Sequence, residues 1–322
     1  MPPFLMVVGC QRSGTTLLKA MLDAHPGVAV PGESHFIAPM SRIARRYQRF
    51  GGFNEAVFHT DLGRFGRLGT WDIPDGALAK WTAGADSLPD AIRRIYAGYA
   101  SVHEATRYVD KTPNYVRSIS RIAALLPETR FVHIIRDPRN VALSLVSRAG
   151  WGPVSVGEAT RYWAKRVRSG IAQGSTLPPS RYMQLRYEDL IADPEGELRQ
   201  ICGFGGISFN PVMLSFETRA DRLLSEVASP EDHQNIRRPV TADLRDFRHE
   251  MTEPDQILVE QVLGPDLDAL GYERMYTKVG ESSSRRSSYA ILLESLPRRA
   301  VALPRHVAFA RNIARSRTVA GC

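Results

Sequence analysis

The chain has 322 residues, of which 43% are apolar, so it can bury the core of one large α/β domain or of two small ones. Most of its net charge of +8 comes from the end of the chain, because residues 277–322 hold nine basic and two acidic residues. The preceding residues hold 33 basic and 32 acidic side chains, and this near-neutral balance argues against a nucleic-acid-binding protein.

The cysteines and the apolar segments indicate the compartment. Cys10, Cys202 and Cys322 are scattered, odd in number and in no CxxC pair, which favours a reducing compartment and argues against a zinc site. No apolar run approaches the roughly 20 residues of a membrane span, and no basic segment precedes the short apolar stretch at the start. We therefore expect a cytoplasmic protein.

Strands and helices are predicted to alternate along the chain. Residues 4–8 form a continuous apolar run, typical of a strand buried on both faces, and residues 14–25 then have helical spacing. Further strands are predicted at residues 28–30, 108–110, 131–135 and 182–185, with helices near residues 114–126, 139–147 and 194–202, and a capping box, SVGE, starting another helix at residue 155. This order predicts an α/β fold with a P-loop-like parallel sheet flanked by helices, which binds ligands at the carboxyl ends of its strands.

The alternation stops between residues 44 and 105, where aromatic residues lie among glycines and arginines. We predict a helical insertion that forms a lid on the acceptor side. Its aromatic residues have two interpretations, a small additional core or contacts to an acceptor. A Ser/Gly-rich break at residues 280–288 predicts that one domain covers residues 1–276 and that residues 277–322 form a linker and a basic amphipathic tail.

The first strand is followed by the segment GCQRSGTT, residues 9–16. At such a strand-to-helix junction, free backbone N–H groups and the helix dipole form an anion site. A nucleotide-triphosphate P-loop would have a lysine where Thr15 stands. We expect Arg12, on the other side of Gly14, to supply the missing positive charge.

A second candidate phosphate site, RDPRNVALS, begins at Arg136 after the predicted strand at residues 131–135. The arginine and Ser144, two helical turns later, can bind a phosphate through charge-assisted hydrogen bonds. The two motifs together resemble the 5′-phosphosulfate and 3′-phosphate sites of sulfotransferases that use 3′-phosphoadenosine 5′-phosphosulfate (PAPS). The eight-residue interval from Arg136 to Ser144 is the interval of that family.

The resemblance covers roughly residues 4–272 and is nearest, in its motifs, to protein-tyrosine and heparan sulfate sulfotransferases. It is carried by GESHF from residue 32, DKTP from residue 110 and RYEDL from residue 186. It implies that Glu33 is the general base, that Lys111 lies at the transferring group and that Tyr187 contributes to the nucleotide site. His35 is a rival base or a neighbour that orients Glu33.

The predicted site therefore has two parts. The catalytic candidates are Glu33, Arg12, Lys111 and His35; the donor-binding candidates are Arg12, Ser13, Gly14, Thr15, Thr16, Arg136, Ser144, Tyr187 and Arg238. Arg238 lies in a loop similar to one in tyrosine sulfotransferases, and Arg245 and Arg248 compete with it as the cover of the 3′-phosphate. No metal is expected, since no carboxylate pair at metal spacing flanks the first loop.

The predicted function is in-line transfer of a sulfuryl group from PAPS to a hydroxyl of a small-molecule, glycolipid or lipid-linked acceptor by a bacterial-type enzyme. Two alternatives remain. The missing loop lysine argues against a P-loop nucleotide kinase, and the presence of Glu33 and Lys111 argues against a catalytically silent PAPS-binding protein. The tail from residue 289 favours either reversible contact with an anionic inner membrane face or an extension that is docked or disordered.

Overall fold

A computed structural model describes residues 2–49, 52–148, 152–225, 236–237 and 245–276. The chain divides into two compact units. The first comprises Met1–Asp137 and Lys165–Leu244, and the second comprises Pro138–Ala164 and Arg245–Cys322. Arg238 and the basic tail, for which the sequence predicts a phosphate contact and a membrane contact, lie outside the described residues.

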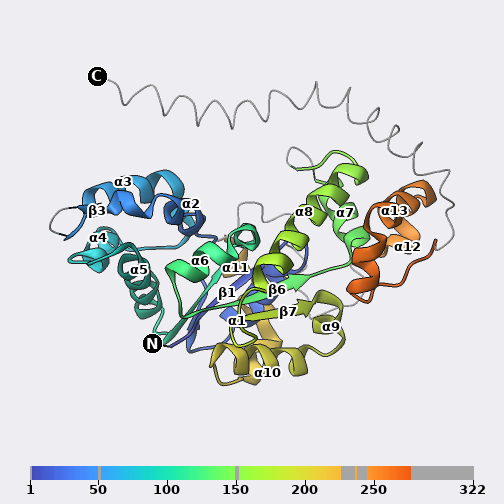
Figure 1. Cartoon of the computed structure of the whole chain (residues 1–322). Coiled ribbons are helices and arrows are strands. Elements are labelled where there is room, and N and C mark those ends of the chain that lie inside the picture. Colours follow the sequence, from blue (N-terminus) through green and yellow to red (C-terminus); the bar gives the residue numbers. More distant parts are fainter. Residues whose placement is uncertain (1, 50–51, 149–151, 226–235, 238–244, 277–322) are drawn as a thin grey trace. The chain divides into compact units, whose positions relative to one another are not determined.

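The first unit is built on a five-stranded parallel sheet with the order β2-β5-β1-β6-β7 (Figure 1). The strands are β1 (Phe4–Gly9), β2 (Val28–Ala29), β5 (Arg107–Lys111), β6 (Thr129–Ile135) and β7 (Tyr182–Arg186). All five predicted strands are confirmed. The central strand β1 is buried on both faces, so its alternate side chains enter two different core clusters, as its continuous apolar run predicts.

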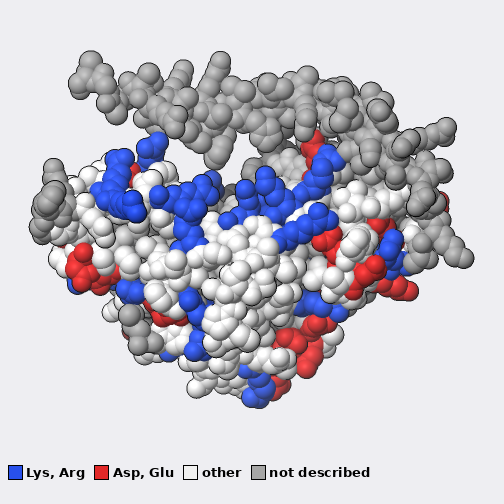
Figure 2. All heavy atoms as spheres, in the orientation of Figure 1, with Lys and Arg blue, Asp and Glu red and all other residues white. Residues whose placement is uncertain are grey.

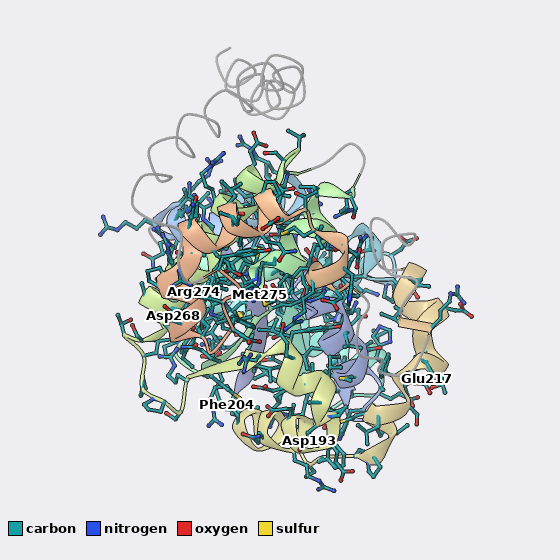
Figure 3. The ribbon with its side chains drawn as sticks, turned by 90° about the vertical axis from the view of Figure 1, so that its right-hand side faces the viewer. Asp193, Phe204, Glu217, Asp268, Arg274 and Met275 are labelled. Atoms are coloured by element: carbon teal, nitrogen blue, oxygen red, sulfur yellow. The ribbon has the colours of Figure 1, made fainter. Side chains whose placement is uncertain are left out.

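Helices cover both faces of this sheet. In chain order they are α1 (Thr15–Asp23), α2 (Ile37–Arg42), η1 (Ala44–Tyr47), α3 (Glu55–Phe65), η2 (Leu68–Thr70), α4 (Ala77–Thr82), α5 (Leu88–Val102), η3 (Pro113–Arg117), α6 (Ile119–Leu125), α9 (Tyr187–Ala192), α10 (Pro194–Gly205), η4 (Pro211–Arg219) and α11 (Ala220–Ser225). Helix α10 begins where the Asp193 carboxylate accepts a hydrogen bond from the Gly196 N–H at 2.9 Å (Figure 3). The single helix predicted for residues 114–126 is wrong, because the non-helical backbone of Ser118 (φ −140°, ψ 17°) separates η3 from α6.

The segment of residues 44–105 is largely helical, as predicted, and also contains a short antiparallel pair, β3 (Gln48–Arg49) and β4 (Gly52–Phe53). Its buried aromatic rings pack together. The Trp71 ring lies 5.2 Å from the Tyr96 ring and 5.4 Å from the Tyr99 ring, and Tyr96 in turn contacts Phe4 of β1 at 4.7 Å. These rings pack in the core, as one of the two interpretations predicts, but they share a core cluster with β1 and do not form a small additional core.

The second unit contains α7 (Pro138–Val146), α12 (Phe247–Glu250) and α13 (Glu253–Ala269), together with the start of α8 (Val156–Gly174). An ion pair at 2.7 Å joins Arg139 to Glu260, and both side chains are only 1% exposed. The Arg139 guanidinium also lies 3.8 Å from the Phe247 ring centroid. Through these two contacts, Arg139, which directly follows the RDP motif, stabilises the second unit.

Short-range ion pairs and hydrogen bonds fix the ends of the helices in the second unit. Beyond α13 the chain turns back, so that Arg274 pairs with Asp268 at 3.3 Å and the Met275 N–H donates to Glu260 (Figure 3). The predicted cap of α8 is confirmed by the hydrogen bond from the Glu158 N–H to Ser155 Oγ at 3.2 Å. No helix in the described part of the chain is long and apolar enough to cross a bilayer.

Candidate active site

The parallel sheet brings most of the predicted site residues of the first unit to one edge. Since carboxyl ends of parallel strands share an edge, the strand order determines the order of the groups along it. The Glu33 loop follows β2, Lys111 ends β5, the loop of residues 9–16 follows β1, Arg136 follows β6 and Tyr187 follows β7. The Glu33–Lys111 pair therefore lies on one side of the β1 loop, and Arg136 with Tyr187 lies on the other.

Glu33, Lys111 and His35 form one connected cluster. The buried Lys111 ammonium donates to Glu33 Oε1 at 2.7 Å, and His35 Nε2 lies 3.1 Å from Glu33 Oε2. His35 has a φ of 57°, in the left-handed region that non-glycine residues rarely adopt. This backbone conformation lets a single tight loop hold the Glu33 and His35 side chains next to each other.

The electrostatics of Glu33 follow from these contacts. Burial by itself would raise the pKa of Glu33, but the Lys111 charge and the hydrogen bonds from His35 and Lys111 outweigh burial and hold this pKa well below its usual value. Glu33 is therefore ionised at neutral pH. Its side chain remains 35% exposed, so the carboxylate is accessible to an incoming hydroxyl group.

A buried polar network beneath this cluster was not predicted from the sequence. Ser34 Oγ donates to Asp110 Oδ2 at 2.7 Å and lies 2.8 Å from the Tyr115 hydroxyl, and the Ser34 N–H donates to Thr112 Oγ1 at 3.1 Å. Tyr96 donates to the same Asp110 oxygen. Because Ser34 lies between Glu33 and His35, and Asp110 precedes Lys111, the network locks the loop to the strand end. Ser34, Asp110 and Thr112 all belong to the GESHF and DKTP motifs, which was the signal in the sequence.

The loop of residues 9–16 has the geometry of an anion site. Arg12 (φ 72°) and Gly14 (φ 93°) both adopt left-handed conformations, and α1 follows Gly14, its N-cap residue, which provides no side-chain cap for the N-terminal N–H groups. Ser13 Oγ is buried and has no hydrogen-bond partner among the described residues. An unsatisfied buried hydroxyl beside uncapped helix N–H groups fits a phosphate or sulfate ligand.

Tyr187 and Arg136 extend this site on the other side of the loop. The Arg136 guanidinium lies over the Tyr187 ring, 4.4 Å from its centroid, and Arg136 Nη1 donates to the Arg12 carbonyl at 3.4 Å. The Tyr187 ring packs directly on Gly14, where a Cβ atom would approach Tyr187 Cδ2 to 2.3 Å. The tyrosine of the RYEDL motif therefore contacts the glycine of the RSGTT motif.

We expect Gly14→Ala to lower the free energy of unfolding by about 2 to 3 kcal/mol, since the new methyl group meets an aromatic ring and the positive φ strains alanine. Urea unfolding measures this change. Gly203→Ala in α10 is the matched control, because its Cβ would meet nothing within 4 Å and alanine favours a helix. Equal loss of stability in the two variants would contradict the contact.

The remaining predicted residues have different outcomes. Thr15 and Thr16 are the first two residues of α1, beside the anion site. Ser144 is buried in α7 of the second unit, and its joint action with Arg136 stays a prediction. In the second unit Arg245 pairs with Glu250 at 2.7 Å and Arg248 lies 3.6 Å from Asp246. No cluster of three or more His, Cys, Asp or Glu side chains suited to a metal ion occurs within the described ranges.

An anion-binding loop beside a lysine–carboxylate pair, at the carboxyl edge of a parallel sheet, defines an α/β enzyme of group transfer. A sequence model of the sulfotransferase family matches residues 3–211, which is more than half of the chain. The chain belongs to the sulfotransferase family, as its motifs predict.

Individual relatives agree with this membership. Protein-tyrosine sulfotransferase A of Caenorhabditis elegans is 24% identical over 84% of this chain and 67% of that protein. Nodulation protein NoeE of Sinorhizobium fredii is 23% identical over 85% of this chain and 67% of that protein. The solved sulfotransferase domain from the curacin biosynthetic pathway has the same fold, with a TM-score of 0.58, 23% identity, and coverage of 85% of this chain and 99% of that domain.

Proposed function

We propose that the chain transfers the sulfuryl group of PAPS to a hydroxyl of a small-molecule, glycolipid or lipid-linked acceptor. The observation that carries this proposal is the order of groups along the sheet edge, with the Glu33–Lys111 pair and the Arg136–Tyr187 pair on opposite sides of the β1 loop. A donor with a 5′-phosphosulfate and a separate 3′-phosphate needs two anion sites on one side of a proton acceptor. In this proposal residues 1–276 are the catalytic domain and residues 44–105 contribute the acceptor side.

Each group has a role in the transfer. The acceptor oxygen forms a bond to sulfur while the bond from sulfur to the 5′-phosphate oxygen breaks, and the hydroxyl proton passes to Glu33. Lys111, Arg12 and the loop N–H groups stabilise the charge on the sulfuryl oxygens and on the leaving phosphate, which departs as 3′,5′-adenosine bisphosphate. Sulfuryl transfer resembles phosphoryl transfer in its loose in-line geometry, so positioning and charge supply most of the catalysis.

Through its ion pair with Lys111, Glu33 should have a pKa that depends on whether the donor is bound. A carboxylate whose pKa is held low is a weak proton acceptor. When Lys111 turns part of its charge to the donor's sulfuryl oxygens, less remains for Glu33, and the pKa of Glu33 rises. We infer that Glu33 becomes an effective base only when the donor is in place.

Donor binding gives the direct test of the proposal. PAPS should bind without divalent metal, and Arg136→Ala should weaken it by about tenfold to a hundredfold, the effect of one lost charge-assisted contact. Titration calorimetry with PAPS and with adenosine 5′-phosphosulfate, which lacks the 3′-phosphate, measures both constants. If adenosine 5′-phosphosulfate binds as tightly as PAPS to both proteins, Arg136 does not serve a 3′-phosphate. Magnesium-dependent transfer from ATP would instead support a nucleotide kinase.

A further inference from the structure

A cavity of about 300 Å³ lies within the helical segment, between α3, η2 and α4. This volume is at the lower end of the range of small-molecule sites, roughly 300 to 1,000 Å³. Three leucines and three glycines form most of its lining, with His59 beside them: Leu62, Leu68, Leu78, Gly63, Gly66 and Gly69. A Cβ atom added at Gly63 or Gly69 would meet nothing within 4 Å, so both glycines leave the cavity open.

One short strip of chain separates this cavity from the Glu33 loop. Gly66, Leu68 and Gly69 of the strip line the cavity. Within the same strip, the Arg67 N–H donates to the Ser34 carbonyl at 3.3 Å. A Cβ atom on Gly32 would approach Thr70 Oγ1 to 2.4 Å, which shows how closely the strip and the loop pack. The cavity is thus a neighbour of the candidate base.

Basic side chains lie on the helical segment that contains the cavity. Figure 2 shows Lys and Arg side chains gathered over α2 and α3. Arg67 lies between two lining residues, is exposed, and forms no ion pair with any of the described residues. Arg64, which follows the lining residue Gly63, is exposed as well. A cavity lined mostly by leucines and glycines, with exposed arginines directly next to its lining residues in the chain, complements a hydrocarbon chain that carries an anionic headgroup.

We propose that the acceptor is an amphipathic molecule whose hydrocarbon chain enters the α3–η2–α4 cavity, while its anionic headgroup contacts Arg67 and its hydroxyl reaches Glu33. This inference rests on the proposed function for the reaction, but its binding part can be tested without transfer. It narrows the class of acceptor to anionic lipid-like molecules, and it assigns to the helical segment the binding of the hydrocarbon chain.

The probes are monoalkyl glycerol phosphates with butyl to decyl chains, which combine a hydrocarbon chain, a free hydroxyl and a phosphate, and the matching uncharged monoalkyl glycerols. Binding to the full chain is measured by calorimetry below the micelle concentration. Gly63→Leu fills the cavity from α3, and Gly69→Leu fills it from η2 in case the first variant does not fold. Gly203→Leu, in α10, is the control for adding leucine at an open helical glycine.

Wild-type protein and Gly203→Leu should bind the phosphates about two- to fourfold more tightly per added methylene until the cavity is filled. Gly63→Leu and Gly69→Leu should lose this dependence and bind the octyl probe at least tenfold more weakly. No chain-length dependence in the wild type, or the same dependence in the filled variants, would overturn the proposal.

Two further measurements separate the parts of the inference. The phosphate series should bind about two- to fivefold more tightly than the uncharged series, and Arg67→Gln should abolish this preference. If the wild type binds both series equally tightly, the proposal that the acceptor has an anionic headgroup is wrong. PAPS binding, measured on the same preparations, should be unchanged in Gly63→Leu. If PAPS fails to bind while the alkyl series behaves as expected, the reaction is wrong and the lipid site stands.

Discussion

Glu33→Gln should lower turnover by about a hundredfold or more without weakening PAPS binding. Glutamine keeps the shape of the side chain and can still accept a hydrogen bond from Lys111, but it cannot take the proton of the acceptor hydroxyl. Radiolabelled sulfate transfer gives the turnover, and calorimetry with PAPS gives the affinity. Glu195→Gln is the matched control, because Glu195 is an exposed glutamate of α10 that pairs only locally with Arg199 at 2.7 Å.

His35 determines how a negative result is interpreted. It lies 3.1 Å from Glu33 Oε2, so a hydroxyl group that reaches one of these two side chains is also near the other. If His35→Ala abolishes transfer and Glu33→Gln retains it, the two roles must be exchanged. A partial loss in His35→Ala, together with the full loss in Glu33→Gln, fits a histidine that positions the glutamate.

Lys111→Met should lower transfer by about a hundredfold to a thousandfold, the range found when one preorganised charge-stabilising donor is removed from an active site. Methionine fills a similar volume in the buried site, so the loss reports the charge. Lys165→Met, at an exposed position of α8, is the control and should keep full activity. Retained transfer in Lys111→Met would exclude a role for Lys111 in the reaction.

The free energy of unfolding of Lys111→Met should also depend on pH differently from that of the wild type. The pKa of Glu33 is depressed in the folded protein, so the ionised pair stabilises the fold above the unfolded pKa of about 4.3, and this contribution is lost as the pH falls through the folded pKa. At pH 7 we expect Lys111→Met to cost about 1 to 2 kcal/mol. This is less than the cost of breaking a fully buried pair, because Glu33 is 35% exposed.

Urea unfolding at several pH values measures this difference. Without Lys111, the largest influence that lowers the pKa of Glu33 is lost and this pKa rises, so the variant loses less stability than the wild type on acidification. The gap between the two proteins should therefore narrow below about pH 4. A gap that stays constant or widens in acid would show that the lost stability comes from packing and not from the ion pair.

The sequence by itself determined the elements and the chemistry that they carry. The continuous apolar run of residues 4–8 was enough to predict β1, because a strand buried on both faces must be apolar throughout, and the alternation of short strand-like and helical segments predicted the other four strands. The motifs around Arg12, Glu33 and Lys111 each follow a strand, and parallel strands end at one edge, so a shared site followed. Helix continuity was harder to predict, since the break at Ser118 depends on how η3 and α6 pack and not on a proline or glycine within the segment.

Only the tertiary structure decided which strands are neighbours. β5 lies between β2 and β1, and this order brings Lys111 within 2.7 Å of Glu33, which is 78 residues away in the chain. Apolar runs resemble one another, so no local pattern determines their pairing; it comes from the combined packing of helices on both faces. The Ser34–Asp110 network has the same cause, because it joins residues that are 76 positions apart in the chain. The cavity beside Arg67 is lined by residues 59–78 alone, but its walls form only when α3, η2 and α4 pack together, so the sequence does not show it either.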